Sequence, residues 1–403
     1  MDKIAIIKES RVDDKRTPLA PKHINALLTR FPNLSITVQP SKHRCFLDQE
    51  YKDCGAIISE DLRTSDLILG VKEIEPHLLI PSKSYMFFSH TTKIQPDNSA
   101  AAQGTPGMDK KELIKEIIKR KITLIDYENI RDDLSRRYLG FGRFAGIVGC
   151  YNSLNLYLET DGQSPMPRAY ELNSYKKLKE NITKRNFANA RIVITGDGRV
   201  ARGSLEFIES ANIKQVTPEE FIENNNTSAV FCNLPTSKYV SNKEGDDFDL
   251  QHFINFPEKY ISVLDKYLHT TTMLITSHYW DPKSPRLFKK NDIVKYAKLK
   301  VIGDITCDIN GSIPTTLRST TIKNPYFYLD PITFKEVEKN KDSLAIMAVD
   351  NLPSELPRDS SAEFGDGIVN EVLPFMIERD DGRILNATIT HKGQFLNKYQ
   401  YLS

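Results

Sequence analysis

The stretch that decides the fold runs from Arg191 to Ile208 and reads RIVITGDGRVARGSLEFI. Its first part, RIVIT, is short, apolar and rich in β-branched residues, which predicts a buried strand. Gly196 and Gly198 then predict a tight turn, and the segment from Arg199 onward predicts a helix. Strand, glycine turn and helix in this order indicate the opening of a β-α-β unit in a parallel sheet.

The spacing of Gly196, Gly198 and Ala201 matches the G-x-G-x-x-G/A pattern of dinucleotide-binding folds. In that pattern the first glycine makes the turn, the second lets a pyrophosphate approach the backbone, and the small third residue lets helix and strand pack closely. Free N–H groups at the start of the helix attract the phosphates. We therefore predict a dinucleotide site on these residues and on the intervening Arg199 and Val200; the alternative is a purely structural turn.

The identity of the dinucleotide stays open. Folds that bind NAD usually place an Asp or Glu at the end of the second strand, about 20 residues after the glycines. Here that strand is predicted to end QVTPEE, with Thr217 at its tip and Glu219 and Glu220 just beyond. Arg199 and Arg202 lie near enough in sequence to meet a 2′-phosphate. The sequence therefore predicts NAD or NADP as the cofactor, with Thr217 as a contact.

Short strand-like runs alternate with helix-like segments in two series, which predicts an α/β protein with mostly parallel sheets. The first series is 3–9, 35–39, 55–59, 67–72, 85–90 and 122–128, and the second is 190–196, 214–217, 228–234, 271–277, 300–308 and 344–350. Helices are predicted at 21–30, 110–121, 140–159 and 361–379, and a polar tail follows. Because 403 residues exceed the usual size of one core, two domains are expected.

Composition and charge exclude several classes of protein. The chain is 39% hydrophobic and 27% charged with a net charge of +2, which gives no reason to expect a nucleic acid or a membrane as partner. Its five cysteines are scattered without metal-ligand spacing, so no metal site or disulfide framework is predicted. The beginning MDKIAIIKES lacks a signal-peptide core, and we expect a cytoplasmic protein.

Eight segments extend the pattern over nearly the whole chain: KRTPLAPKHI (15–24), ILGVKE (68–73), MFFSHTTKIQ (86–95), LIDYE (124–128), RYLGFGRFAG (137–146), YISVLDKYLHTTTMLITSHYWDPKSPRL (260–287), GDITCDINGSI (303–313) and AVDNLPSELPRDSSAEFGD (348–366). In this order they resemble the lysine-ketoglutarate reductase domain of the bifunctional aminoadipic semialdehyde synthases. The lysine-forming saccharopine dehydrogenases resemble them too, and alanine dehydrogenases and transhydrogenase domains do so more distantly.

The resemblance implies two Rossmann-like domains with an interdomain cleft. Residues 1–136 and 353–403 would form the substrate-binding domain, similar to the N-terminal domain of alanine dehydrogenase, and 137–352 the dinucleotide-binding domain. The implied reaction joins the ε-amine of lysine to 2-oxoglutarate by reduction to give saccharopine, or runs in reverse. The partners would be small molecules, an amino acid and a 2-oxo acid, and the chain would be a monomer or homodimer.

Two strand-like runs, LILGVKE (67–73) and SYMFFSH (84–90), each end in an ionisable side chain, Lys72 in the first and His90 in the second. Taken alone, each residue reads as surface charge at the end of a strand. In the resembling family the lysine of this motif takes the proton that the secondary amine must lose before hydride leaves. His90 would exchange protons with water during formation or hydrolysis of the imine. We therefore predict Lys72 and His90 as catalytic residues.

The resemblance also implies contacts around this pair. Arg16 and Arg137 would bind the carboxylates of the substrate, because guanidinium binds carboxylate bidentately. Glu73 and Glu128 would tune the protonation of Lys72 and His90, and Glu128 is also predicted to belong to the substrate site. Lys93 and Gln95 are predicted substrate contacts. Asp350 is predicted to contact the cofactor or to cap a turn, and His278 is a reserve candidate for the acid/base role.

Two rival functions remain open at this stage. The first is an alanine-dehydrogenase-like or other opine-forming enzyme, in which ammonia or another amine replaces lysine. The second is a regulatory protein that binds the nucleotide without catalysis.

Overall fold

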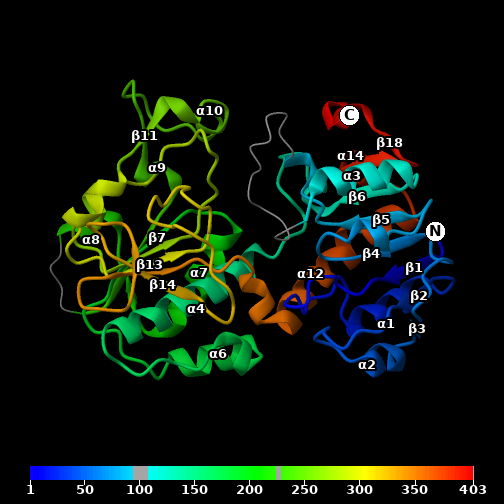
Figure 1. The fold of residues 1–403 in the computed structure, drawn as a ribbon, viewed down its shortest axis with the longest axis horizontal. Helices are drawn as coiled ribbons and strands as arrows, with labels where there is room; N and C mark the ends of the chain where they lie inside the picture. Colours follow the sequence, from blue (N-terminus) through cyan, green and yellow to red (C-terminus); the bar gives the residue numbers. More distant parts are fainter. Residues whose placement is uncertain (94–107, 224–227, 403) are drawn as a thin grey trace. The chain divides into compact units, whose positions relative to one another are not determined.

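The structure is a computed structural model that describes residues 1–93, 108–223 and 228–402. The chain folds into two compact units, Met1–Phe141 with Pro357–Ser403, and Gly142–Leu356 (Figure 1). The sequence placed the corresponding boundaries after residue 136 and before residue 353. Each unit is built around an eight-stranded, mostly parallel sheet, so the predicted α/β fold class is confirmed. The predicted interdomain cleft stays a prediction.

The first unit, called the N-terminal unit below, has the strand order β18-β17-β6-β5-β4-β1-β2-β3. Its strands are β1 (Lys3–Ile6), β2 (Ser35–Val38), β3 (Ile57–Ile58), β4 (Leu67–Leu69), β5 (Ser84–Phe87), β6 (Thr123–Asp126), β17 (Thr388–His391) and β18 (Gln394–Phe395). The strands from β1 to β6 are parallel, and β17 joins β6 antiparallel. The predicted polar tail therefore adds two strands to this sheet. Because the order reverses between β1 and β4, their carboxyl ends form a topological switch point, where such sheets bind ligands.

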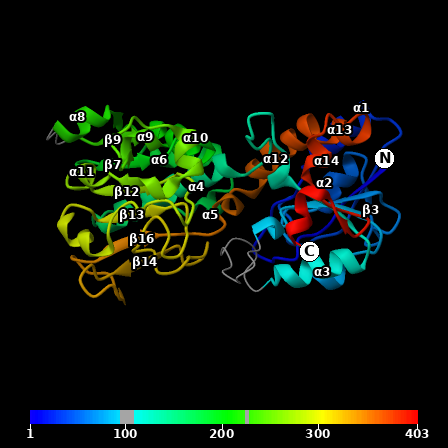
Figure 2. The same cartoon turned by 90° about the horizontal axis from the view of Figure 1, so that it is seen from above.

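Helices cover both faces of this sheet, as Figure 2 shows. In β1, Ile4 and Ile6 point toward α1 (Pro21–Arg30) and α12 (Pro357–Glu371), while Ala5 points toward α3 (Lys110–Lys119). Successive side chains of a strand point to opposite faces, so an unbroken apolar run is the sequence of a strand buried on both sides. The smaller helices are α2 (Asp48–Asp53), α13 (Leu373–Ile377) and α14 (Arg383–Ala387).

The second unit, called the central unit below, has the strand order β15-β14-β16-β13-β12-β7-β9-β8. Its strands are β7 (Arg191–Thr195), β8 (Lys214–Gln215), β9 (Val230–Leu234), β12 (Met273–Thr276), β13 (Val301–Asp304), β14 (Tyr326–Leu329), β15 (Glu336–Val337) and β16 (Leu344–Met347). The switch point lies between β7 and β12. The predicted second strand, β8, is not beside β7, because β9 lies between them.

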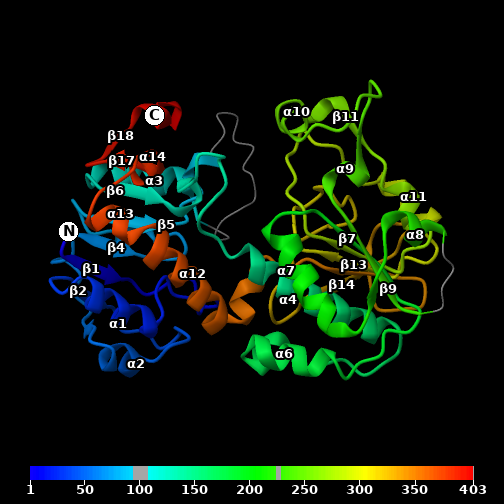
Figure 3. The same ribbon diagram turned by 180° about the vertical axis from the view of Figure 1, so that it is seen from behind.

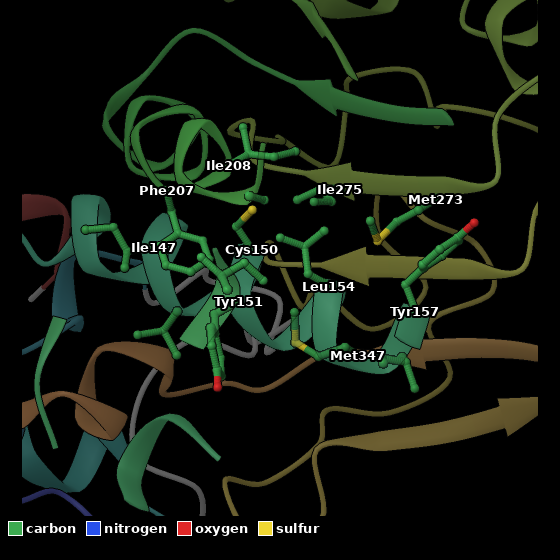
Figure 4. Close-up of a cluster of buried hydrophobic side chains, with 14 of the residues drawn as sticks. Ile147, Cys150, Tyr151, Leu154, Tyr157, Phe207, Ile208, Met273, Ile275 and Met347 are labelled. Carbon is green, nitrogen blue, oxygen red and sulfur yellow. The ribbon is translucent and has the colours of Figure 1, made fainter. Parts of the chain in front are cut away.

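The long apolar helix predicted at 140–159 is α4 (Gly142–Thr160), which packs along α7 (Arg199–Ile208) (Figure 3). Glycines permit this contact: a Cβ at Gly146 would lie 1.9 Å from the Val200 carbonyl oxygen, and one at Gly203 would lie 2.0 Å from that of Arg143. The two helices and the strands enclose one apolar core, in which Tyr151 of α4 packs against Phe207 of α7 (Figure 4).

The opposite face of the central sheet is covered by α8 (Pro218–Glu223) and α11 (Asp265–Leu268). The long connection between β9 and β12 carries α9 (Thr236–Tyr239), α10 (Leu250–Asn255) and the antiparallel pair β10 (Val240–Asn242) and β11 (Tyr260–Ser262). The remaining helices of this unit are α5 (Ala169–Leu172) and α6 (Tyr175–Ile182). None of the helices in the described parts of the chain combines the length and apolar character needed to cross a bilayer.

Candidate functional site

Charged side chains gather at the switch point of the N-terminal unit. Asp14 and Arg16 follow β1 and are both almost fully buried, and Asp14 accepts hydrogen bonds from Arg16 Nε at 2.9 Å and Nη2 at 2.5 Å. Burial opposes ionisation of Asp14, but Arg16 outweighs it and holds the pKa of this carboxyl well below its usual range. The Arg16 guanidinium also lies 4.2 Å from the ring centroid of Phe141. The predicted carboxylate ligand Arg16 thus already binds an internal carboxylate.

Lys72 follows β4 and shares this environment. Burial and the positive charge of Arg16 lower the pKa of the Lys72 ammonium, while Asp14 and Glu73 oppose that shift. A lysine with a lowered pKa loses its proton at a lower pH than an exposed lysine does. Its side chain is then a neutral amine that can accept a proton, as a general base must.

Glu9, which follows β1, holds the backbone beside this lysine. One of its carboxylate oxygens accepts the N–H of Val71 at 2.7 Å and the other accepts that of Lys72 at 2.9 Å. Burial and the charge of Asp14 raise the pKa of Glu9 to about 8. The sequence interpretation missed Glu9, although KIAIIKE ends in an ionisable residue just as LILGVKE does.

The structure brings His90 and Glu73 together. His90 Nδ1 lies 2.7 Å from Glu73 Oε1, and both residues are buried. His90 has a φ of +52°, a left-handed conformation that is uncommon outside glycine, and its ring stacks on Phe88. The carboxylate fixes the ring and favours a proton on Nδ1, so Nε2 is the nitrogen available for exchange with a substrate.

A second carboxylate cluster follows β6. Asp126 is fully buried and accepts hydrogen bonds from the Ser89 hydroxyl at 2.5 Å and from the backbone N–H of Glu128 at 2.8 Å. Burial and the charge of Glu128 raise the pKa of Asp126. Glu128 in turn lies 3.3 Å from Arg137 Nη1, so the structure pairs two residues that the sequence assigned to substrate. Asp126 orders the segment that carries His90, a role that sequence reasoning missed.

The two remaining predicted substrate contacts lie at the margin of the described chain. Lys93 ends the short 3₁₀ helix η2 (Thr91–Lys93). Gln95 lies outside the described residues. Both assignments stay predictions.

The glycine turn of the central unit has the geometry that the sequence predicts. Gly196 has a φ of +101°, and a Cβ there would lie 2.8 Å from the Ser277 carbonyl oxygen, so only glycine fits. A Cβ at Gly198 would meet nothing within 4 Å, which leaves open space at the start of α7. Ala201 is fully buried against the core. These residues, with the neighbouring Val200, fit the approach of a dinucleotide pyrophosphate to the backbone.

Asn233, in β9, holds the glycine turn from the side. Its Nδ2 donates hydrogen bonds to the carbonyl oxygens of Ile194 at 3.2 Å and Gly196 at 2.9 Å. Sequence reasoning missed this residue, because it sought the contacts only in the glycine turn and at the end of the predicted second strand. The signal available in the sequence was a polar residue near the end of the apolar run SAVFCNL.

The two acidic residues just after Thr217, Glu219 and Glu220, interact with neighbouring protein groups. Thr217 and Glu220 form the capping box of α8: the Thr217 N–H donates to Glu220 at 2.9 Å, and the Glu220 N–H donates to the Thr217 hydroxyl at 3.1 Å. Glu219 pairs with Lys238 at 3.0 Å. Arg199 and Arg202 are exposed at the start of α7. Thr217 follows β8, and β9 lies between β8 and β7 in the sheet.

His278 and Asp350 follow two other strands of this sheet. His278 Nδ1 lies 2.8 Å from the Thr195 hydroxyl, its Nε2 is buried without a hydrogen-bond partner among the described residues, and burial lowers its pKa to about 4. The reserve candidate is therefore a neutral imidazole beside the glycine turn. Asp350 lies in a turn after β16, and its backbone N–H donates to the Thr320 carbonyl oxygen at 3.4 Å.

Metal-ligand clusters are absent from the described ranges, in which no three His, Cys, Asp or Glu side chains converge. All five cysteines are free thiols.

Comparisons with known proteins agree with the expected family. Residues 5–148 match the family described as "Alanine dehydrogenase/PNT, N-terminal domain". The alpha-aminoadipic semialdehyde synthase of Arabidopsis thaliana is 30% identical over 447 residues, which are 96% of this chain and 40% of that protein. The mitochondrial enzyme of Bos taurus is 28% identical over 442 residues, 96% of this chain and 46% of that protein. The predicted resemblance is confirmed.

The chain spans less than half of these two relatives. A relative of similar length is the Neurospora crassa "Saccharopine dehydrogenase [NAD(+), L-lysine-forming]", 24% identical over 364 residues that are 86% of this chain and 83% of that protein. Among solved structures, an L-alanine dehydrogenase has a TM-score of 0.63 at 14% identity, covering 99% of this chain and 98% of that one. The transhydrogenase of Sinorhizobium meliloti has a TM-score of 0.59 at 14% identity, covering 98% and 99%. These two structures share the fold of this chain.

Proposed function

We propose that this protein interconverts saccharopine with L-lysine and 2-oxoglutarate by hydride transfer to or from a nicotinamide dinucleotide. The observation that carries the proposal is Lys72 at the switch point of the N-terminal unit. Its ammonium has a lowered pKa beside Arg16, in the unit that also holds the His90–Glu73 pair. The names of the relatives support the substrate class.

The protein's own residues handle the protons. In the lysine-forming direction the secondary ammonium of saccharopine must lose a proton before hydride leaves the adjacent carbon, and the neutral amine of Lys72 accepts that proton. Hydride departure leaves an imine, water adds to it, and the carbinolamine breaks into lysine and 2-oxoglutarate. His90 Nε2 takes the proton from the attacking water and returns it to the leaving amine, while Glu73 stabilises the imidazolium.

The substrate carboxylates need cationic partners. Arg137 is 40% exposed and retains access to solvent beside Glu128. Arg16 is buried with Asp14, so a substrate carboxylate would compete with an internal one. We therefore assign Arg137 as the main carboxylate ligand and propose that Arg16 chiefly sets the protonation of Lys72. Arg137→Lys should raise KM for 2-oxoglutarate more than for lysine, because the bidentate fork is lost while the charge is kept.

The open space at Gly198 fits a dinucleotide, which when bound supplies the hydride acceptor or donor. We propose that NADPH is accepted at least as well as NADH. Two observations support this: Glu220 is bound in the capping box, and the segment PTSK (235–238), which follows β9 beside β7, carries no carboxylate. Lys238 and the exposed Arg199 and Arg202 offer positive charge on this side.

The cofactor proposal is tested by titration of each dinucleotide without substrate. Lys238→Ala and the double variant Arg199→Ala/Arg202→Ala should weaken NADPH selectively. Lys214→Ala is the matched control, because Lys214 pairs with Val230 at the opposite end of β9. A preference for NADH above about 100-fold in Kd, or about 2.7 kcal/mol, would show that an acid reaches the ribose.

An alanine-dehydrogenase-like reaction is the second candidate, because residues 5–148 match the alanine dehydrogenase/PNT family. One panel separates the functions: oxidation of NADH or NADPH with 2-oxoglutarate plus lysine, ornithine, alanine or ammonia, and with pyruvate plus ammonia. Turnover with lysine supports the proposal. Turnover only with ammonia or another amine supports the second candidate, and nucleotide binding without any turnover supports a regulatory protein. A cytoplasmic location and a monomeric or homodimeric state stay part of the proposal.

A further inference from the structure

The end of β4 is held by a side chain where the backbone ladder stops. The ladder runs as far as the Ile7 N–H, which donates to the Leu69 carbonyl oxygen at 3.0 Å. Beyond it, the backbone N–H groups of Val71 and Lys72 donate to the two carboxylate oxygens of Glu9 at 2.7 and 2.9 Å. The Glu9 side chain therefore continues the ladder by two hydrogen bonds, and these bonds fix the backbone from which the Lys72 side chain projects.

The neighbouring sheet contacts fix the other side of the same segment. The Gly70 N–H donates to the Met86 carbonyl oxygen, and the Phe88 N–H donates to that of Val71, each at 3.0 Å. A Cβ at Gly70 would lie 3.2 Å from Ile7 Cγ2, so a larger residue would crowd β1. Residues 70–72 are thus held between β5 and Glu9, and within the described ranges Glu9 is the acceptor for the N–H of Lys72 itself.

Glu9 acts on Lys72 through this backbone. The charges that move the pKa of the Lys72 ammonium most are those of Arg16, Asp14, Glu73 and Arg11. The ammonium has its lowered pKa because it is buried beside Arg16, and that placement depends on the direction in which the strand end points the side chain. If residues 71 and 72 could relax, the amine would gain access to water and ionise more readily.

We propose that Glu9 is a positioning residue that clamps the backbone of residues 71–72 and thereby keeps the Lys72 amine in its buried place beside Arg16. This inference rests on the proposed function only in that it takes Lys72 to be the base. The clamp itself is a statement about the substrate-free protein and can be tested in that state.

The decisive variant is Glu9→Gln, which keeps the size of the side chain. An amide offers one acceptor oxygen, and its NH2 group has no lone pair for the second N–H, so one of the two hydrogen bonds is replaced by a contact between donors. A protonated carboxyl differs from the amide here, because its hydroxyl oxygen can still accept. Glu60→Gln is the matched control: Glu60 lies in the same unit, is exposed, and accepts from Lys8 at 3.2 Å and Gln39 at 3.1 Å.

The first measurement needs no substrate. The rate at which Lys72 is acylated by acetic anhydride is followed over pH by mass spectrometry of its peptide, which gives the pKa of its ammonium. We expect the profile of Glu9→Gln to move to higher pH than that of the wild type, while Glu60→Gln leaves it unchanged. An unchanged profile in Glu9→Gln overturns the proposal, even if activity falls.

The second measurement uses turnover. We expect kcat of Glu9→Gln to fall about 10- to 100-fold, the range for a lost orienting hydrogen bond, while the Kd of the dinucleotide stays the same. If Glu9→Gln does not fold, Glu9→Asp keeps both acceptor oxygens one methylene farther away; it should shift the profile in the same direction, and an unshifted profile overturns the proposal. If the wild type turns over no amine with 2-oxoglutarate, the proposed function fails, and the acylation profile still decides the role of Glu9.

Discussion

The two units reverse their strand order at equivalent places, between β1 and β4 in the N-terminal unit and between β7 and β12 in the central unit. The residues at these two switch points differ in kind. In the N-terminal unit they are ionisable and paired: Glu9, Asp14, Arg16 and Lys72. In the central unit they are glycines, backbone groups and a neutral histidine. Under the proposed function, one topology therefore carries proton chemistry in one unit and a backbone surface suited to phosphates in the other.

The difference follows from what each site must hold. A proton acceptor needs a pKa moved by burial and by neighbouring charge, so charges of both signs gather around Lys72. A pyrophosphate needs backbone N–H groups that it can approach closely, so side chains are absent at Gly196 and Gly198.

The largest effect is expected at Lys72. Lys72→Met should lower kcat by about 100-fold or more, because the general base is lost, and it should leave the Kd of the dinucleotide unchanged. Steady-state kinetics and a titration of the cofactor measure the two halves of the prediction. Full activity in this variant would show that Lys72 is not the base. The N-terminal switch point would then have no assigned role in proton transfer.

Gly203 of the central unit should matter through packing alone. A Cβ there would lie 2.0 Å from the Arg143 carbonyl oxygen, so Gly203→Val must push α7 away from α4. We expect a loss of about 2 kcal/mol or more in the free energy of unfolding, as overpacking produces. Urea denaturation measures it, with Arg202→Val as a control for placing a β-branched residue in α7, since Arg202 lies in the same helix and is exposed. Equal stability of both variants would contradict the close helix contact.

His278 predicts a pH dependence of stability. Its folded-state pKa is about 4, below the ordinary value of 6.5, so between these values the unfolded chain binds more protons. Stability of the central unit should therefore fall as the pH is lowered from about 6.5 toward 4. His278→Gln should flatten that part of the profile in urea melts at successive pH values. An unchanged slope would mean that His278 is not buried as a neutral imidazole.

The smallest effect is expected at Asp304, a fully buried carboxylate at the end of β13. It accepts from the hydroxyls of Thr276 at 2.7 Å, Thr306 at 2.5 Å and Thr316 at 2.6 Å. Because hydroxyls can also accept, Asp304→Asn should cost less than about 1 kcal/mol in unfolding free energy, whereas Asp304→Leu should cost at least about 2 kcal/mol. A large loss in the Asn variant would show that the central unit, too, needs a buried charge.

Local patterns in the sequence were enough to predict much of this protein. The glycine turn after β7, the parallel strands and the helix α4 depend on neighbouring residues, whose backbone preferences and apolar spacing can be read directly. The motifs around Lys72, His90 and Arg16 were found in the same way, and the resemblance they suggested is confirmed. The strands β17 and β18 were missed, because both are short and largely polar in sequence and so carry little apolar pattern.

Only the tertiary structure decided which residues meet. The insertion of β9 between β7 and β8 places Asn233, and not Thr217, beside the glycine turn. The bond from the Lys72 N–H to Glu9 spans 63 residues, and Arg16 and Phe141, which pack together, lie far apart in the chain. Such contacts depend on strand order and on the packing of whole elements, which no local stretch specifies. The sequence by itself therefore determined the kinds of chemical group at each sheet edge, and the fold determined their pairing, because burial and neighbouring charge exist only once the strands are assembled.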